Sequence, residues 1–137
     1  MGSYIKVRVD EKKLREAIRS YLQDIYKYNR RIGGNYYLKP VHIVYKRGPE
    51  GEIKEYRYYG RYWYAVEYYG KSRGKSVIKW LYLGRNKPRG VPPPPKNPLE
   101  GLRYYTIRGE PRYLYVDSKT LERFSWFFEK VAPEGPL

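Results

Sequence analysis

The chain has 137 residues, enough for one compact domain, and its 29 Lys and Arg outnumber its 14 Asp and Glu to give a net charge of +15. Cysteine is absent and His42 is the only histidine, which excludes a disulfide scaffold, a Cys-ligated zinc site, an iron–sulfur cluster, a thiol nucleophile and a cage of histidine ligands. No apolar run approaches the roughly 18–20 residues of a membrane helix, and residues 1–10 contain no signal-peptide core. We therefore expect an intracellular protein without membrane contacts.

Tyrosine is unusually frequent, at 19 residues against 3 Phe and 3 Trp. A tyrosine ring packs well on a half-buried sheet face while its hydroxyl stays wet, and it can also stack on nucleobases. The low content of thermally labile side chains fits a thermophile, for example an archaeon or an archaeal virus.

Charge is distributed unevenly along the chain. Residues 1–50 carry 12 basic and 5 acidic side chains, residues 51–90 carry 10 and 3, and residues 91–137 carry 7 and 6. Between Tyr68 and Leu99 there is no acidic residue at all. Because self-repulsion of this size opposes folding, the charge predicts a polyanionic partner rather than solubility alone.

The first third of the chain predicts a strand followed by a helix. Residues 4–9 alternate between apolar and polar, as in a half-buried strand. Asp10 is a helix N-cap candidate, and apolar residues then recur at helical spacing until Gly33-Gly34 stops the pattern. We therefore expect a helix over residues 11–30 with one apolar face.

The middle of the chain predicts four strands joined by short connections. A turn at residues 47–52, a bend at Gly60 and a basic loop at residues 70–75 separate them. The expected strands are 36–46, 53–59, 61–69 and 76–83. The last three are expected to form an antiparallel meander.

The remaining residues predict a connector, a hairpin and a helix. Pro92 to Pro95 indicate a stiff polyproline II spacer. A hairpin is expected over residues 104–116, and a helix capped by Asp117 or Ser118 is expected to run to about Val131.

The predicted fold class is α+β, with an antiparallel sheet of about five to seven strands and an N-terminal and a C-terminal helix packed on it. Residues 1–137 form one domain in this interpretation. A strand–helix–meander unit spans residues 1–90, a Pro-rich connector residues 91–100, and a hairpin with the C-terminal helix residues 101–132.

The hairpin over residues 60–84 is the strongest functional candidate. Two strands with a basic tip can enter the major groove of a duplex, which admits a β-ribbon. Both faces of the predicted strands carry aromatic residues, so the sequence leaves open which face belongs to the core. The expected nucleic-acid contacts are Arg61, Lys71, Arg73, Lys75, Lys79, Arg85, Lys87 and Arg89, with Tyr62, Tyr64 and Tyr68 as stacking or sugar contacts.

The same hairpin carries a resemblance to a known family. Its pattern is Gly60-Arg61-Tyr62-Trp63-Tyr64, then Glu67-Tyr68, Gly74-Lys75 and Lys79-Trp80-Leu81-Tyr82-Leu83-Gly84. This pattern resembles the N-terminal arm-type DNA-binding hairpin of tyrosine recombinases of archaeal viruses, and hairpins of related small basic archaeal and viral proteins. The resemblance covers residues 60–84 and implies DNA contact through a small sheet. It does not imply recombination, because the chain has no room for the catalytic domain, and the loop 70–75 is longer and more basic than in that family.

Several other functions remain open from the sequence. Residues 61–68 approach an RNA-recognition signature but have Tyr62 and Tyr64 where that signature needs small residues. A structural or assembly protein of a virus or archaeon, pairing through an exposed sheet edge as a homo-oligomer, is one alternative. A small metal-dependent nuclease using Glu52, Glu55 and Glu67 is another. We expect no cofactor, no catalytic or metal-binding residues and a structural role for His42, and we favour DNA over RNA as the partner.

Overall fold

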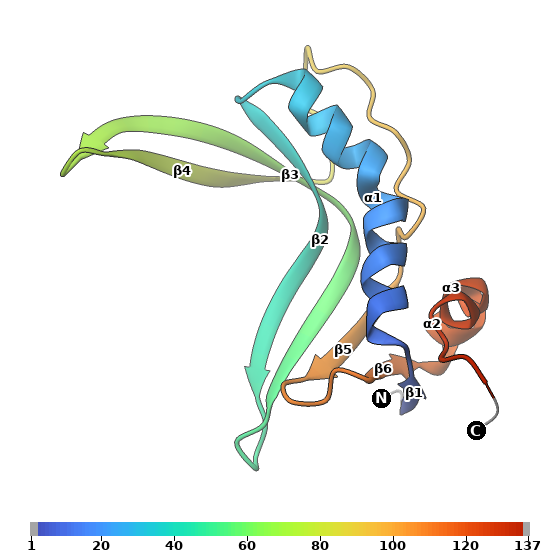
Figure 1. The fold of residues 1–137 in the computed structure, drawn as a ribbon. Helices are drawn as coiled ribbons and strands as arrows, with labels where there is room; N and C mark the ends of the chain where they lie inside the picture. Colours follow the sequence, from blue (N-terminus) through green and yellow to red (C-terminus); the bar gives the residue numbers. More distant parts are fainter. Residues whose placement is uncertain (1–2, 136–137) are drawn as a thin grey trace.

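The computed structural model describes residues 3–135, so the ends of the predicted domain, residues 1–2 and 136–137, lie outside the described part. It confirms the α+β class, with six antiparallel strands and three helices among the described residues (Figure 1). The order across the sheet is β1-β6-β5-β3-β2. Strand β4 also pairs with β3, along the part of β3 that follows its pairing with β5. The elements are β1 (Tyr4–Arg8), α1 (Glu11–Ile32), β2 (Tyr36–Arg47), β3 (Ile53–Ser72), β4 (Lys75–Gly84), β5 (Arg103–Ile107), β6 (Tyr113–Asp117), α2 (Ser118–Arg123) and α3 (Ser125–Lys130).

Helix α1 begins and ends close to the predicted positions. The Asp10 carboxylate accepts a hydrogen bond from the Lys13 backbone N–H at 2.9 Å, which satisfies one of the free donors of the first turn. Gly33 ends the helix with a φ of +88°, a value that favours glycine. Near this end, the Asn29 amide bonds both backbone groups of Leu38 at 2.8 Å and joins α1 to β2.

Strand β3 corrects the predicted meander. The two strands expected at residues 53–59 and 61–69 are one continuous strand of 20 residues, and Gly60 lies inside it. Lys39 pairs with Tyr62 and Val41 with Tyr59, so Gly60 and Arg61 together oppose Pro40. The glycine therefore marks a β-bulge that bends the strand without ending it, and Pro40 occupies the position where a ladder hydrogen bond is missing.

The Pro-rich connector is hydrogen-bonded to the backbone at this bend. The side-chain amide of Asn97 donates to the carbonyl oxygens of Pro40 at 3.2 Å and Gly60 at 3.1 Å, and its oxygen accepts from the Leu99 N–H at 2.9 Å. The connector also runs beside the C-terminal half of α1 (Figure 1), where the Tyr28 hydroxyl donates to the Pro92 carbonyl. The connector therefore packs against the rest of the protein, whereas the sequence predicted only a spacer.

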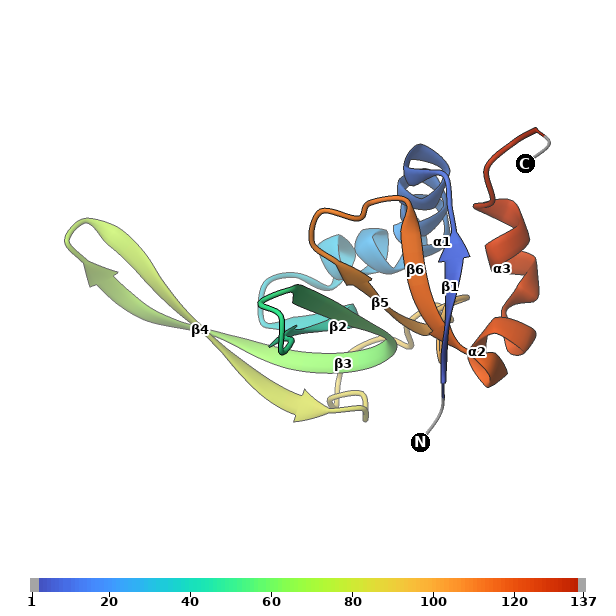
Figure 2. The same ribbon diagram turned by 90° about the horizontal axis from the view of Figure 1, so that it is seen from below.

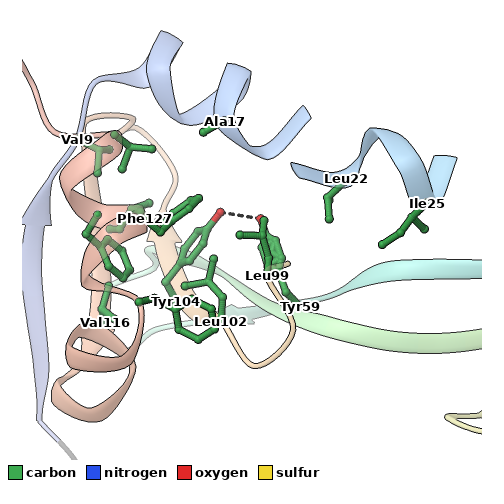
Figure 3. Packing of buried hydrophobic residues seen from close by; sticks show 14 of the residues in the cluster. Val9, Ala17, Leu22, Ile25, Tyr59, Leu99, Leu102, Tyr104, Val116 and Phe127 are labelled. Atoms are coloured by element: carbon green, nitrogen blue, oxygen red, sulfur yellow. Dashed lines mark hydrogen bonds between the residues drawn. The ribbon is translucent and has the colours of Figure 1, made fainter. Parts of the chain in front are cut away.

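The core lies on one face of the sheet, between the strands and the helices (Figure 3). Leu22 and Ile25 of α1 and Phe127 of α3 are each at most 1% exposed. Beneath them, the hydroxyls of Tyr59 and Tyr104 share a hydrogen bond of 2.8 Å, so both rings are buried with their polar ends paired.

The C-terminal helix also differs from the prediction. Instead of one helix to Val131, two short helices meet at Phe124, whose φ of −110° and ψ of 29° leave the helical region. Asp117 is the N-cap, and it accepts from the backbone N–H and the hydroxyl of Thr120. Phe124, Phe127 and Phe128 are all buried in the core, although their spacing would also place them on one face of an unbroken helix.

Replacing Asn97 with Asp tests the role of the connector. The change keeps the acceptor for Leu99 and removes the donor to the two buried carbonyls. We expect the free energy of unfolding to fall by about 2 kcal/mol or more, since buried acceptors lose their partner beside a new charge. Urea unfolding measures this loss, with Asn86→Asp in the exposed segment that follows β4 as the control. Equal stability of the two variants would show that Asn97 does not hold the bend.

Candidate nucleic-acid interface

Residues 67–79, here called the arm, protrude from the body of the protein as a two-stranded ribbon (Figures 1 and 2). The pairing of β2 with β3 ends at Tyr36 and Ala65, so β3 and β4 continue alone from Glu67 and Lys79. An isolated hairpin is only marginally stable in water, so the arm depends on its continuity with the strands of the body.

The tip of the arm is built for a tight turn with positive charges. Arg73 and Gly74 have φ values of 52° and 79°, as a type I′ hairpin turn requires. Lys71, Arg73 and Lys75 are all exposed around this turn. Within residues 3–135, no ion pair involves these three side chains, so their charges face solvent.

The remaining basic candidates are distributed over different surroundings. Lys79 lies 5.9 Å from the Tyr69 ring on the arm, whereas the Arg61 guanidinium is bound to Glu100 at 2.8 Å at its base. The Lys87 ammonium donates to the backbone carbonyls of Pro88 and Val91, so its charge is engaged within the fold. Arg85 and Arg89 are exposed in the segment after β4. The structure thus brings Lys71, Arg73, Lys75 and Lys79 together on the arm and places the other four outside it.

The structure also settles which face of the long hairpin belongs to the core. Trp63 is 1% exposed and contacts Tyr28 of α1, so its side of β3 faces the helices. Tyr62, Tyr64 and Tyr68 alternate with it and lie on the opposite side, here called the open face. On that face the Tyr64 ring lies 5.4 Å from Tyr82 and 5.9 Å from Trp80 of β4.

The open face continues across the body of the sheet as a row of tyrosines that sequence reasoning missed. Tyr56 and Tyr58 have parallel rings 6.4 Å apart on β3, and Tyr56 lies 5.0 Å from Tyr105 of β5. Tyr105 in turn stacks on Tyr115 of β6 at 4.7 Å. Alternation in residues 54–58 is a signal for the first two, but Tyr105 and Tyr115 meet only because the register pairs them.

Lysines accompany these rings. The ammonium of Lys46 lies 4.8 Å from the centre of Tyr56, that of Lys54 lies 5.1 Å from Tyr105, and that of Lys6 lies 4.2 Å from Tyr113. Such contacts are cation–π interactions. His42 belongs to the same face, where its ring lies 5.4 Å from that of Tyr62.

A hollow of about 370 Å³ opens where β4 has ended and β5 has not yet begun along β3. Tyr58 and Tyr62 line it beside a group of arginines, Arg61, Arg85, Arg103 and Arg123, with Glu100 as its carboxylate. Glu100 binds Arg61, and Arg103 binds Asp117 at 2.9 Å. Arg85 and Arg123 have no carboxylate partner within residues 3–135. The hollow is therefore positively charged and bordered by aromatic rings.

Burial and neighbouring charge raise the pKa of four hydroxyls on this face. Burial raises the pKa of Tyr56, Tyr62 and Tyr105. For Tyr115, burial and a hydrogen bond to the Glu110 carboxylate at 2.7 Å together raise the pKa to about 12. At neutral pH the hydroxyls of Tyr56, Tyr62, Tyr105 and Tyr115 are therefore neutral beside the lysines of this face.

The carboxylates considered for a metal site have separate partners. Glu55 is bound by the Arg57 guanidinium at 2.9 Å, while Glu67 accepts from the Tyr69 hydroxyl on the arm. Burial alone would raise the pKa of Glu55, but hydrogen bonds from Arg57 and Tyr45 outweigh it and the pKa is lowered. Across residues 3–135, no group of three or more His, Asp or Glu side chains is placed to hold a metal ion.

None of the helices in the described part of the chain is long and apolar enough to cross a membrane. No family model matches the chain, and neither a curated protein nor a solved structure is found to be similar to it.

The Tyr115 hydroxyl gives a prediction about alkaline pH. Its pKa is raised in the folded protein, so the unfolded chain ionises first and stability falls as pH rises from about 10 to about 12. Glu110→Gln removes the negative charge and should lower the pKa of Tyr115 toward its ordinary value. Carbon-13 NMR of the labelled tyrosine rings follows this titration, with the exposed Glu129→Gln as control. An unchanged pKa of Tyr115 in Glu110→Gln would contradict the role of the carboxylate.

Proposed function

We propose that the protein binds nucleic acid, with DNA favoured over RNA, and that the arm provides its main electrostatic contact. The observation that carries this proposal is the arm itself. It projects from the body, exposes Lys71, Arg73 and Lys75 around one tight turn, and holds them free of carboxylates. A ribbon of two strands fits the duplex major groove, and exposed cations bind phosphates with release of counterions.

The net charge of +15 supports the same function. With six to eight phosphate contacts from the arm and the adjoining arginines, the logarithm of the binding constant should fall against the logarithm of salt concentration with a slope of about −5 to −7 on duplex DNA. Fluorescence anisotropy of a labelled duplex across a salt titration measures this slope. A slope shallower than about −2 is incompatible with an electrostatic mechanism.

Neutralising the tip tests the arm directly. The variant Lys71→Thr, Arg73→Asn, Lys75→Thr removes three charges but keeps strand-forming residues and an Asn-Gly turn, which tolerates the positive φ. We expect binding to weaken ten- to hundredfold, the salt slope to become shallower by about 3, and the melting temperature to stay unchanged. The control removes three exposed charges from α1 instead, as Lys12→Ala, Arg19→Ala, Lys27→Ala. Equal affinity of the two variants would show that only net charge matters and that the arm has no special role.

One observation favours assembly as a second candidate function. The hairpin exposes apolar side chains, among them Ile78 at 54% and Leu83 at 45%, which an interaction with phosphates alone would not require. A second copy of the chain could cover them through strand pairing or packing. The oligomeric state without nucleic acid distinguishes this candidate from the first.

A further inference from the structure

We propose that the open face of the sheet binds a single-stranded segment of nucleic acid, with its bases stacked on Tyr58 and Tyr62 and its backbone in the arginine hollow beside them. This proposal rests on the proposed function in that the ligand is nucleic acid, but it assigns a second site outside the arm and a different strand state.

The first argument is the supply of aromatic surface. Five tyrosines of β3 and β4 lie on the open face: Tyr56, Tyr58, Tyr62, Tyr64 and Tyr82. The ring centres are 6.4 Å apart for Tyr56 and Tyr58, 6.5 Å for Tyr62 and Tyr82, and 5.4 Å for Tyr64 and Tyr82. Every base has a π-face, so a row of rings accepts unpaired bases of any sequence, whereas paired bases keep their faces inside the duplex stack.

The second argument is charge complementarity next to these rings. Arg85 and Arg123 line the hollow without a carboxylate partner in the described chain, and Arg61 and Arg103 line it with one each. Guanidinium groups bind phosphate oxygens in a bidentate manner. The same hollow is bordered by Tyr58 and Tyr62, so a nucleotide could place its phosphate and its base on adjoining surfaces.

The third argument is that all helices lie on the other side of the sheet. The core formed with α1, α2 and α3 involves the face of Trp63, Tyr104 and Leu114, and Figure 2 shows the helices gathered on one side of the strands. Two helical residues reach the margins of the open face: Tyr26 of α1 lines a hollow with Tyr64 and Trp80, and Arg123 of α2 lines the arginine hollow. A ligand can therefore approach Tyr58 and Tyr62 between these margins.

The test compares two double variants that leave the net charge unchanged. Tyr58→Leu, Tyr62→Leu removes rings from the open face, and the control Tyr45→Leu, Trp126→Leu removes two exposed rings, 59% and 41% accessible, from the helix side of the molecule. Each protein is titrated by anisotropy with an oligothymidylate and with an abasic strand of equal length. We expect the open-face variant to bind the oligothymidylate about ten- to hundredfold more weakly than wild type. The abasic strand should bind all three proteins alike, with an unchanged salt slope.

A fluorescence measurement tests the same site in a protein that keeps Tyr58 and Tyr62, so the test does not depend on the folding of the open-face variant. In Trp126→Phe protein the emitting tryptophans are Trp63, which is buried, and Trp80, which is 50% exposed on the open face. Stacked bases should quench Trp80, and the abasic strand should leave its emission unchanged.

The outcomes separate the two proposals. Equal loss of affinity in both double variants, or equal affinity for the two strands together with no quenching, would overturn the open-face site and leave the arm untouched. An arm-tip variant with unchanged affinity for duplex, combined with base-dependent binding to the open face, would overturn the arm instead. Sedimentation of wild type as a dimer and of the open-face variant as a monomer would show that a second copy covers this face, and would also overturn the single-strand proposal.

Discussion

The bend in β3 is the constraint on which the rest of the structure depends. One strand of 20 residues pairs with β2 on both sides of the bulge opposite Pro40, and only its last residues, 67–72, belong to the arm. A bulge leaves backbone carbonyls without ladder partners, and Asn97 supplies donors to two of them. The connector therefore passes the bend before the chain reaches β5. Between the end of β4 and the start of β5, the edge of β3 has no strand partner, and the arginine hollow lies at this gap.

The same bend explains why the aromatic residues fall into two groups. On the helix side the rings are enclosed, and the paired hydroxyls of Tyr59 and Tyr104 show how such burial is satisfied. On the other side the rings contact each other at varied angles, and most remain partly exposed, as for Tyr82 at 56%, although Tyr105 is only 8% exposed. Because alternation along a strand is strict between bulges, each tyrosine is assigned to one group by its register alone.

Local patterns were sufficient to predict most elements of the fold. Asp10 and Gly33 delimit α1 as expected, and the alternation at residues 4–9 marks β1, because both signals arise from neighbouring residues.

That β3 is one continuous strand was not predictable. Gly60 indicates the end of a strand unless its contacts with the opposing Pro40 and the distant Asn97 are known. The break at Phe124 was not predictable either, because the spacing of Phe124, Phe127 and Phe128 is equally typical of one unbroken helix. At the candidate site, the charges of the arm tip are visible in the sequence. The pairing of Arg61 with Glu100 and the stacking of Tyr105 on Tyr115 depend on contacts between distant residues.

The choice of tyrosine and lysine on the open face has a physical consequence for binding. Lys46 and Lys54 rest over tyrosine rings, and each contact of this kind is worth roughly 0.5–1 kcal/mol at an exposed site. A base that stacks on such a ring must displace the ammonium, but the freed cation can then pair with a phosphate of the same strand. The exchange replaces a cation–π contact by a base–ring contact and an ion pair, so the lysines need not oppose stacking. A phenylalanine surface would stack equally well, but without hydroxyls it would be a larger apolar patch in water and more prone to aggregation.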